Sequence, residues 1–304
     1  MLVGTHGGLY RVPREPFESP EQLLDGRIND LWRGDSWFAA TEAGLFRSVD
    51  GETWTRQPIP ESAISVTGSG DRLFVGTYPA DVFVGERDGD AWTWTAAGEF
   101  REVADTDRWR DRSPRADGSE VRSLAVGSAG RLVAGIEVGG ALVSTDDGET
   151  WTDRSDGLHD DVHELLAVGD GEFVAATGNG LYRTVDAGRA WQRLDTDFRD
   201  FWYNYHRTVA RYEGDLFTSA VGWGPDDGTG ATFIYTPDGI ERIETPLDAA
   251  VIVGCAVTDG CLYAVTLGCR DGFGQSVPSE LVRYDGEWDV LGTVPAGGRT
   301  LELE

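Results

Sequence analysis

The stretch Ser144–Trp151 reads STDDGETW, and it decides the fold because the chain repeats it. The phrase returns as SVDGETW at Ser48–Trp54 and as TVDAGRAW at Thr184–Trp191. An apolar segment that begins with glycine precedes each copy: GALV from Gly140, GLFR from Gly44 and GLYR from Gly180. Recurrence of one strand–turn–strand phrase predicts a repeat architecture in which a single supersecondary unit is stacked many times.

The repeated phrase has a structural explanation. Serine and aspartate side chains bond the backbone N–H groups of a tight turn, glycine supplies a positive φ, and tryptophan packs inward. We therefore assign scaffolding, and no catalysis, to these residues: Ser48, Asp50, Trp54, Ser144, Asp146, Gly148, Trp151, Asp186, Gly188 and Trp191.

Ser144–Trp151 matches the pattern S-x-D-x-G-x-T-W at every fixed position. Weaker matches to this pattern occur at Asp88–Trp92 and Asp285–Trp288. On these motifs the chain resembles the Asp-box, or BNR-repeat, family of β-propellers over nearly its whole length. The resemblance implies that each box lies between the third and fourth strands of a blade, away from the usual active face. The family includes sialidases and non-catalytic propellers such as photosystem assembly factors and sortilin-type receptors.

The predicted fold is all-β: residues 1–304 form a single seven-bladed β-propeller of four-stranded antiparallel blades, with six blades as the alternative. Six innermost strands are expected to begin near Ile28, Ala63, Val121, Val162, Tyr205 and Val251. The opening hairpin at residues 2–25 lacks such a strand, and the alternating tail Arg299–Glu304 can supply it and close the ring. The longest interval contains an insertion loop, 99–118, which is either a lid or contact arm or a solvated loop.

The chain is strongly acidic, with 53 acidic and 26 basic residues and a net charge of −27. All of the bases are arginines. Because salt screens the self-repulsion of a dense carboxylate surface, we interpret this composition as adaptation to very high salt and expect a haloarchaeal source. The charge argues against a nucleic-acid partner. The absence of lysine excludes Schiff-base chemistry and a P-loop.

Targeting signals and membrane spans are not apparent. The sequence enters a strand pattern at MLVGT, and no stretch has the ~18 apolar residues that a span requires. We expect a cytoplasmic monomer without a membrane partner. The three cysteines, Cys255, Cys261 and Cys269, match no zinc spacing and are expected to be reduced. Neither a metal nor a cofactor is predicted.

Ligands of propellers usually bind at one end of the central channel, where second strands turn into third strands and where innermost strands begin. Two sets of residues are expected there, and we treat His163 and His206 as equivalent positions of neighbouring blades. The turn positions are His6, Glu42, Tyr78, Glu137 and Asn179, with Trp223 and Arg270 in two longer loops. The strand positions are Asn29, Arg122, His163, Glu164, His206 and Arg207. This mixture suits a polar ligand, and a hydrated channel mouth is the alternative.

Two functions remain open. Tyr10-Arg11-Val12-Pro13 resembles the Phe/Tyr-Arg-Ile-Pro motif of sialidases, but Arg11 is repeat-equivalent to Arg47 and Arg183, which indicates a scaffold role. Glu42 and Glu137 are the carboxylates to test for another glycosidase. The aromatic segment 198–206 can stack on a sugar or a partner, or pack beneath the long loops. We favour a non-catalytic scaffold that binds a protein or polar ligand, including glycans, over a glycoside hydrolase.

Overall fold

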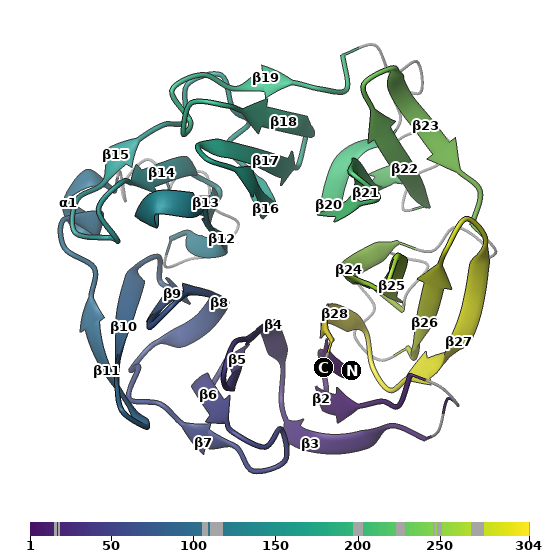
Figure 1. The fold of residues 1–304 in the computed structure, drawn as a ribbon, viewed down its shortest axis with the longest axis horizontal. Coiled ribbons are helices and arrows are strands. Elements are labelled where there is room, and N and C mark those ends of the chain that lie inside the picture. The colour runs from purple at the N-terminus through teal and green to yellow at the C-terminus, as the bar shows by residue number, and fades with distance from the viewer. Residues whose placement is uncertain are drawn as a thin grey trace. The chain divides into compact units, whose positions relative to one another are not determined.

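The computed structural model describes residues 1–14, 17, 19–104, 109, 118–196, 203–222, 229–245, 247, 251–268 and 277–303. These residues form seven four-stranded antiparallel sheets, the blades of a seven-bladed β-propeller (Figure 1). The prediction of seven blades is confirmed. The described ranges are almost entirely β, and their short helical elements include α1 (Phe100–Val103) and the 3-10 turn η1 (Ser128–Gly130).

The chain divides into two compact units. The first unit comprises Met1–Trp37, Ser48–Trp54 and Asp195–Glu304. The second unit comprises Phe38–Arg47 and Thr55–Leu194. Blades 1, 6 and 7 belong to the first unit, and blades 3, 4 and 5 belong to the second.

Each blade is written from its innermost to its outermost strand. Blade 1 contains β28 (Gly298–Glu302), β1 (Leu2–Thr5), β2 (Gly8–Arg11) and β3 (Glu21–Asp25). Blade 2 contains β4 (Ile28–Arg33), β5 (Trp37–Thr41), β6 (Gly44–Ser48) and β7 (Thr55–Arg56). Blade 3 contains β8 (Ser62–Ser69), β9 (Arg72–Tyr78), β10 (Val82–Asp88) and β11 (Ala91–Ala96).

The remaining blades follow the same order. Blade 4 contains β12 (Glu120–Val126), β13 (Leu132–Glu137), β14 (Gly140–Ser144) and β15 (Thr152–Asp153). Blade 5 contains β16 (Val162–Gly169), β17 (Glu172–Thr177), β18 (Gly180–Thr184) and β19 (Gln192–Arg193). Blade 6 contains β20 (Tyr203–Tyr212), β21 (Asp215–Gly222), β22 (Gly230–Thr236) and β23 (Gly239–Ile243). Blade 7 contains β24 (Ile252–Thr258), β25 (Cys261–Thr266), β26 (Ser279–Tyr284) and β27 (Trp288–Val294).

Blade 1 is completed by the two ends of the chain. Strand β28 pairs antiparallel with β1, with Leu2 opposite Glu302 and Val3 opposite Leu301. Figure 1 marks the N and C ends beside each other at this blade. The ammonium group of Met1 donates a 3.0 Å hydrogen bond to the carbonyl oxygen of Val12. The predicted closing strand is therefore confirmed.

The core of the second unit is formed by its inner strands. The second strands β13 and β17 are buried along nearly their whole length, whereas the outermost strand β15 is exposed. A side chain from the repeated turn completes each hydrophobic cluster, Trp151 in one and Trp191 in the other. This arrangement explains why apolar residues fill the inner strands and polar residues the outer ones.

The described part of the insertion 99–118 packs against this core. Phe100 is fully buried and its ring meets the ring of Trp151 edge-on, with 5.0 Å between centroids. Trp109 is also buried in the same cluster. Neither side chain is solvated. Residues 105–108 and 110–117 lie outside the described residues.

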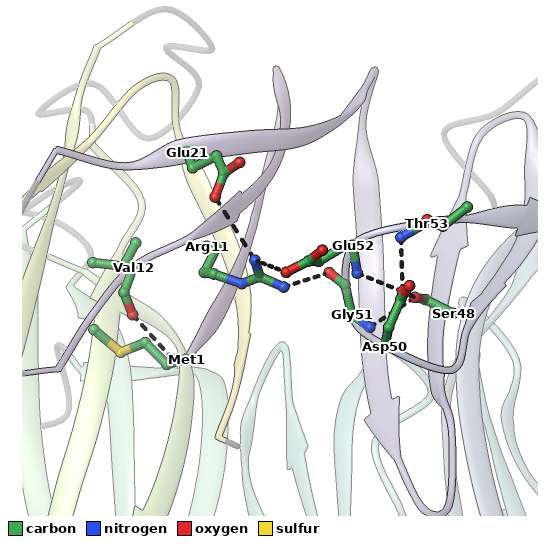
Figure 2. Close-up of polar contacts among 9 residues, drawn as sticks. All are labelled: Met1, Arg11, Val12, Glu21, Ser48, Asp50, Gly51, Glu52 and Thr53. Atoms are coloured by element: carbon green, nitrogen blue, oxygen red, sulfur yellow. Dashed lines mark hydrogen bonds and ion pairs between the residues drawn. The ribbon is translucent and has the colours of Figure 1, made fainter.

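The turn after β6 shows how the repeated phrase holds its shape (Figure 2). The hydroxyl of Ser48 donates to Asp50 Oδ1 at 2.9 Å and accepts a bond from the N–H of Gly51 at 2.8 Å. The N–H groups of Glu52 and Thr53 both donate to Asp50 Oδ1 at 2.8 Å. Together, the bonds from Thr53, Glu52 and Ser48 lower the pKa of Asp50 to about 2. The carboxylate thus stabilises the turn in its ionised form.

The equivalent turns in blades 4 and 5 repeat this geometry. Ser144 donates to Asp146 at 2.8 Å, and Thr184 donates to Asp186 at 2.9 Å. The N–H of Gly148 reaches Ser144 Oγ at 2.8 Å. Burial opposes ionisation of Asp146, but hydrogen bonds from Thr150 and Ser144 outweigh it and lower the pKa of the carboxyl. The pKa of Asp186 is lowered by the N–H of Ala190 and the hydroxyl of Thr184.

Candidate functional site

The end of each blade that carries the turn between its second and third strands is called the entry end here. His6, Glu42 and Asn179 lie in such turns, and Tyr78 and Glu137 are the last residues of β9 and β13. Arg122, His163, His206 and Arg207 lie near the starts of innermost strands, as the sequence predicts. Trp223, Arg270 and the segment 198–202 lie outside the described residues.

In blade 4 the entry end holds a guanidinium between two carboxylates. Arg122 Nε is 3.3 Å from Glu137 Oε2, and Arg122 Nη1 is 3.9 Å from Glu120 Oε1. Glu120 is 3% exposed and lies directly opposite Glu137 in the β12–β13 register. Because like charges on opposed strands repel, the arginine is needed to hold the two carboxylates together.

Blade 3 adds a second ion cluster that the sequence did not reveal. Arg101, at the start of the insertion, donates to Asp81 Oδ2 at 2.6 Å and lies 3.7 Å from Glu61. The side chain of Asp81 is only 1% exposed. Burial raises the pKa of Asp81, although the N–H of Val82 and the Arg101 guanidinium work against that rise. The partners are far apart in sequence, so no local spacing pattern points to them.

Blade 5 places a buried imidazole beside a carboxylate. His163 Nε2 lies 3.3 Å from Asp161 Oδ2, and the histidine side chain is 2% exposed. Nearby in the same blade, Asn179 Oδ1 accepts a 3.3 Å bond from Arg193. The second unit therefore presents arginine, histidine and carboxylate groups at the entry ends of three blades.

In blade 6, within the first unit, His206 forms a buried chain of polar groups. Thr218 Oγ1 donates to the carbonyl oxygen of Thr208 at 2.8 Å and lies 3.0 Å from His206 Nδ1. Because the hydroxyl proton of Thr218 is used in the bond to Thr208, His206 Nδ1 is the donor in the contact between His206 and Thr218. His206 Nε2 faces the buried carboxylate of Asp195 at 3.6 Å. Thr218 is fully buried, so its hydroxyl cannot act on an external substrate.

The expected equivalence of His163 and His206 is wrong. A β-bulge shifts the register of β16 at His163, of β20 at Arg207 and of β12 at Arg122. These three residues are the equivalent ones, and His206 corresponds to the buried aliphatic Val162. Strand β20 also has a second bulge at Asn204, before the shared one.

Other candidates make local contacts. The Arg207 guanidinium lies over the ring of Tyr205, with 5.7 Å to the centroid, in a cation–π contact. The N–H of His6 donates to the carbonyl oxygen of Gly297 at 2.8 Å. Glu42 is exposed. Tyr203 is buried, and its hydroxyl lies 3.0 Å from that of Thr229.

Arg11 lies away from the entry end, at the other end of β2 from His6. Its Nη2 donates to the carbonyl oxygen of Gly51 at 2.9 Å, and Nη1 lies 3.3 Å from Glu52 and 3.7 Å from Glu21 (Figure 2). In the second unit Arg47 repeats the arrangement by donating to the carbonyl oxygen of Asp90 at 2.6 Å. Both arginines therefore join a third strand to the outer turn of the following blade.

The described ranges contain no cluster of three or more histidine, cysteine, aspartate or glutamate side chains that could hold a metal ion. They also contain no helix long and apolar enough to cross a membrane. Cys255 and Cys261 are free and half-buried, and Cys269 lies outside the described residues.

No protein-family model and no curated protein sequence matches the chain. Solved structures do match. The extracellular domain of a hybrid two-component system from B. thetaiotaomicron has a TM-score of 0.64 at 15% identity, covering 86% of this chain and 36% of that one. A GH74 enzyme from Niastella koreensis has a TM-score of 0.63 at 13% identity, covering 95% and 46%.

A third match, YCF48 from Cyanidioschyzon merolae, has a TM-score of 0.61 at 16% identity and covers 97% of this chain and 89% of that one. The chain spans less than half the length of the first two proteins. Structural neighbours of this chain are thus β-propellers, and at these identities the likeness concerns the fold.

Proposed function

We propose that this chain is a non-catalytic binding module that holds a protein or a polar ligand, glycans included, at the entry ends of its blades. The observation that carries the proposal is the contact of Glu137, one of the two carboxylates that the sequence offers for hydrolysis, with an arginine. Glu137 lies 3.3 Å from Arg122, which also faces Glu120. A carboxylate oxygen that already contacts a guanidinium is engaged within the protein, and this contact favours a structural role for Glu137 over a catalytic one.

The same end offers groups that suit recognition. Arg122 lies beside Glu137 and Arg101 lies beside Glu61, so partly exposed donors and acceptors occur together at this end. Such an arrangement fits a ligand that carries both hydrogen-bonding types, as peptides and glycans do. A structural neighbour, YCF48, has been solved bound to D1 peptide, which is support by analogy of fold.

A glycoside hydrolase is the second candidate, because GH74 enzymes are among the structural neighbours. The position of Arg11 weighs against a sialidase. Its guanidinium is engaged with Gly51, Glu52 and Glu21 at the far end of β2, where it stabilises the scaffold.

The finer features of the proposal follow from the sequence. We assign the Ser/Thr–Asp turns to the Asp-box type and the chain to a propeller of that family. We further propose that it works at high salt, in the cytoplasm and as a monomer. The dense acidic composition supports the proposal that the protein works at high salt.

The test combines binding with turnover in molar KCl. Immobilised protein is probed with peptide and glycan arrays, and aryl glycosides are assayed in parallel. We expect a retained ligand that is lost in Arg122→Ala and kept in Arg189→Ala, an exposed arginine of a repeated turn. Aryl glycosides should not turn over. Hydrolysis that disappears in folded Glu137→Gln would replace the binding proposal with the hydrolase.

A further inference from the structure

A groove of about 780 Å³ lies between blades 6 and 7, at the opposite end of the blades from the entry end. It is built from the β20–β21 turn, the end of β22, strand β23 and the β26–β27 turn. All of these elements belong to the first unit. The sequence analysis assigned no binding role to the residues of the groove, although Asp285–Trp288 was noted there as a weak copy of the repeated turn.

The groove coincides with a shortened turn. In blade 5 the third and fourth strands are joined by residues 185–191, and in blade 7 by residues 285–287 only. In blade 5 the turn's Trp191 donates a 2.8 Å bond to the carbonyl oxygen of Arg154 in blade 4. Blade 7 keeps the tryptophan as Trp288 but lacks the residues of the complete turn, and the groove lies where the shorter turn leaves room.

One side of the groove is aromatic. The ring centroids of Tyr212 and Tyr284 are 5.5 Å apart, and those of Tyr284 and Trp288 are 4.9 Å apart. Trp288 also packs against Phe217, which fixes its ring in the core of the first unit. Rings held in this way offer a rigid surface for a cation or an apolar stem at little entropic cost.

The residues that line the groove have a higher ratio of acidic to basic side chains than the whole chain has. Five carboxylates line the groove, with Arg242 as the one basic residue of its lining: Glu213, Asp215, Glu241, Glu244 and Glu287. The whole sequence has 53 acids to 26 bases, so the excess here is clearly larger. Arg242 itself lies over the ring of Tyr203, 5.0 Å from the centroid. The five carboxylates outnumber this single arginine, and their negative charge favours a positively charged ligand.

The wall along β23 is a strand edge. The consecutive residues 241–245 all line the groove. Successive side chains of a strand point to opposite faces, so the side chains on one face of the sheet cannot account for all five. The wall is therefore the strand itself, and β23 is the outermost strand of its sheet. In blades 2, 4 and 5 the outermost strands β7, β15 and β19 have two residues each, whereas β23 has five.

From these observations we infer that the groove binds an extended, arginine-bearing segment of a partner protein. The segment pairs its backbone with the edge of β23, and its guanidinium lies against the Tyr284 and Trp288 rings among the carboxylates. This site is separate from the one proposed at the entry end, so either can fail without the other.

Calorimetric titration of the full chain with a capped valine–arginine–valine tripeptide tests the site. The citrulline counterpart has the same shape without the charge, and we expect it to bind about tenfold more weakly or worse. The double variant Glu241→Gln/Glu287→Gln should weaken the arginine peptide to a similar degree. The matched control Glu149→Gln/Asp90→Asn changes two exposed acids of other outer turns and should bind as the wild type does.

Two further probes keep the inference open to refutation. The arginine peptide with methylated backbone nitrogens should bind more weakly, because it cannot pair with the strand edge. Equal affinity for the methylated peptide, or for argininamide, would overturn the peptide assignment. Three results would show that the groove is not an arginine-binding site. They are equal affinity for the citrulline peptide, unchanged binding by the folded Glu241→Gln/Glu287→Gln variant, and no binding of the arginine peptide at all.

Discussion

The guanidinium of Arg11 donates a 2.9 Å hydrogen bond to the carbonyl oxygen of Gly51, forty residues further along the chain. The contact joins strand β2 to the turn that Asp50 holds in shape, and Glu52 and Glu21 flank the guanidinium (Figure 2). An arginine that the motif pattern could assign to substrate binding is therefore part of the scaffold.

Replacing Arg11 by alanine should lower the free energy of unfolding by about 1–2 kcal/mol, because one charge-assisted bond to a backbone carbonyl is lost and the flanking ion pairs are partly exposed. Urea denaturation measures the change. The control Arg189→Ala removes an exposed arginine that contacts only its own turn through Asp186, and it should change stability by less than about 0.5 kcal/mol. Similar losses in the two variants would show that the contact with Gly51 is not stabilising.

Trp151→Ala should destabilise the protein by roughly 3–5 kcal/mol, since the ring is buried against Phe100 and leaves a cavity when removed. Thermal and urea unfolding both report the loss. Asp146→Asn, in the same turn, should leave any binding activity of the folded protein intact. A binding defect in that folded variant would contradict the scaffold role of the turn.

Glu302 predicts a pH dependence of stability. Burial raises the pKa of this carboxyl to about 7; the N–H of Leu303 and Arg33 oppose the rise, and Asp30 adds to it. The folded protein then holds a proton that the unfolded chain releases at lower pH. The contribution of this group to stability is present below about pH 4.5 and is lost as the pH rises to about 7.

Glu302→Gln should therefore be more stable than the wild type at pH 8 by about 3 kcal/mol, with the difference shrinking toward pH 4.5. Unfolding curves measured across that range give the difference directly. Glu149→Gln, at an exposed turn position, serves as the control. A constant difference between Glu302→Gln and the wild type would show that the carboxyl does not titrate in this range.

The charge of −27 predicts a strong dependence on salt. The melting temperature should rise markedly between 0.1 M and 2 M KCl, because counterions screen repulsion among the carboxylates. Differential scanning fluorimetry at fixed pH is sufficient to measure it. If melting occurs at the same temperature in both salts, the composition has another origin.

The sequence predicted the blades well because a buried apolar residue lies at or next to the start of innermost strands, as Ile28, Val121 and Val162 do. Strands β4 and β16 begin at the expected Ile28 and Val162, and the other four begin within two residues of their predicted starts. The closing role of the tail followed from its alternation. These features depend on local patterns of hydrophobic residues, which a sequence displays directly.

The site was harder to predict, for two physical reasons. The shared bulge falls on His163 in β16 but on Arg207 in β20, and a bulge leaves no fixed mark in the sequence. The pairing of Asp81 with Arg101 and of Asp195 with His206 depends on segments that only the folded chain brings together. The groove beside Trp288 was signalled by the shorter turn at Asp285–Glu287, which could have been noticed as a deviation from the repeat.

The pairing of β28 with β1 has a consequence for synthesis on the ribosome. Strand β1 is synthesised long before β28, so blade 1 lacks its innermost strand until residues 298–302 have been made, and β1 is the inner edge of a partial sheet until then. An exposed edge of that kind can capture the wrong strand. Completing blade 1 then requires residues 2–5 to find residues 298–302, and so large a separation along the chain makes this pairing slow and late.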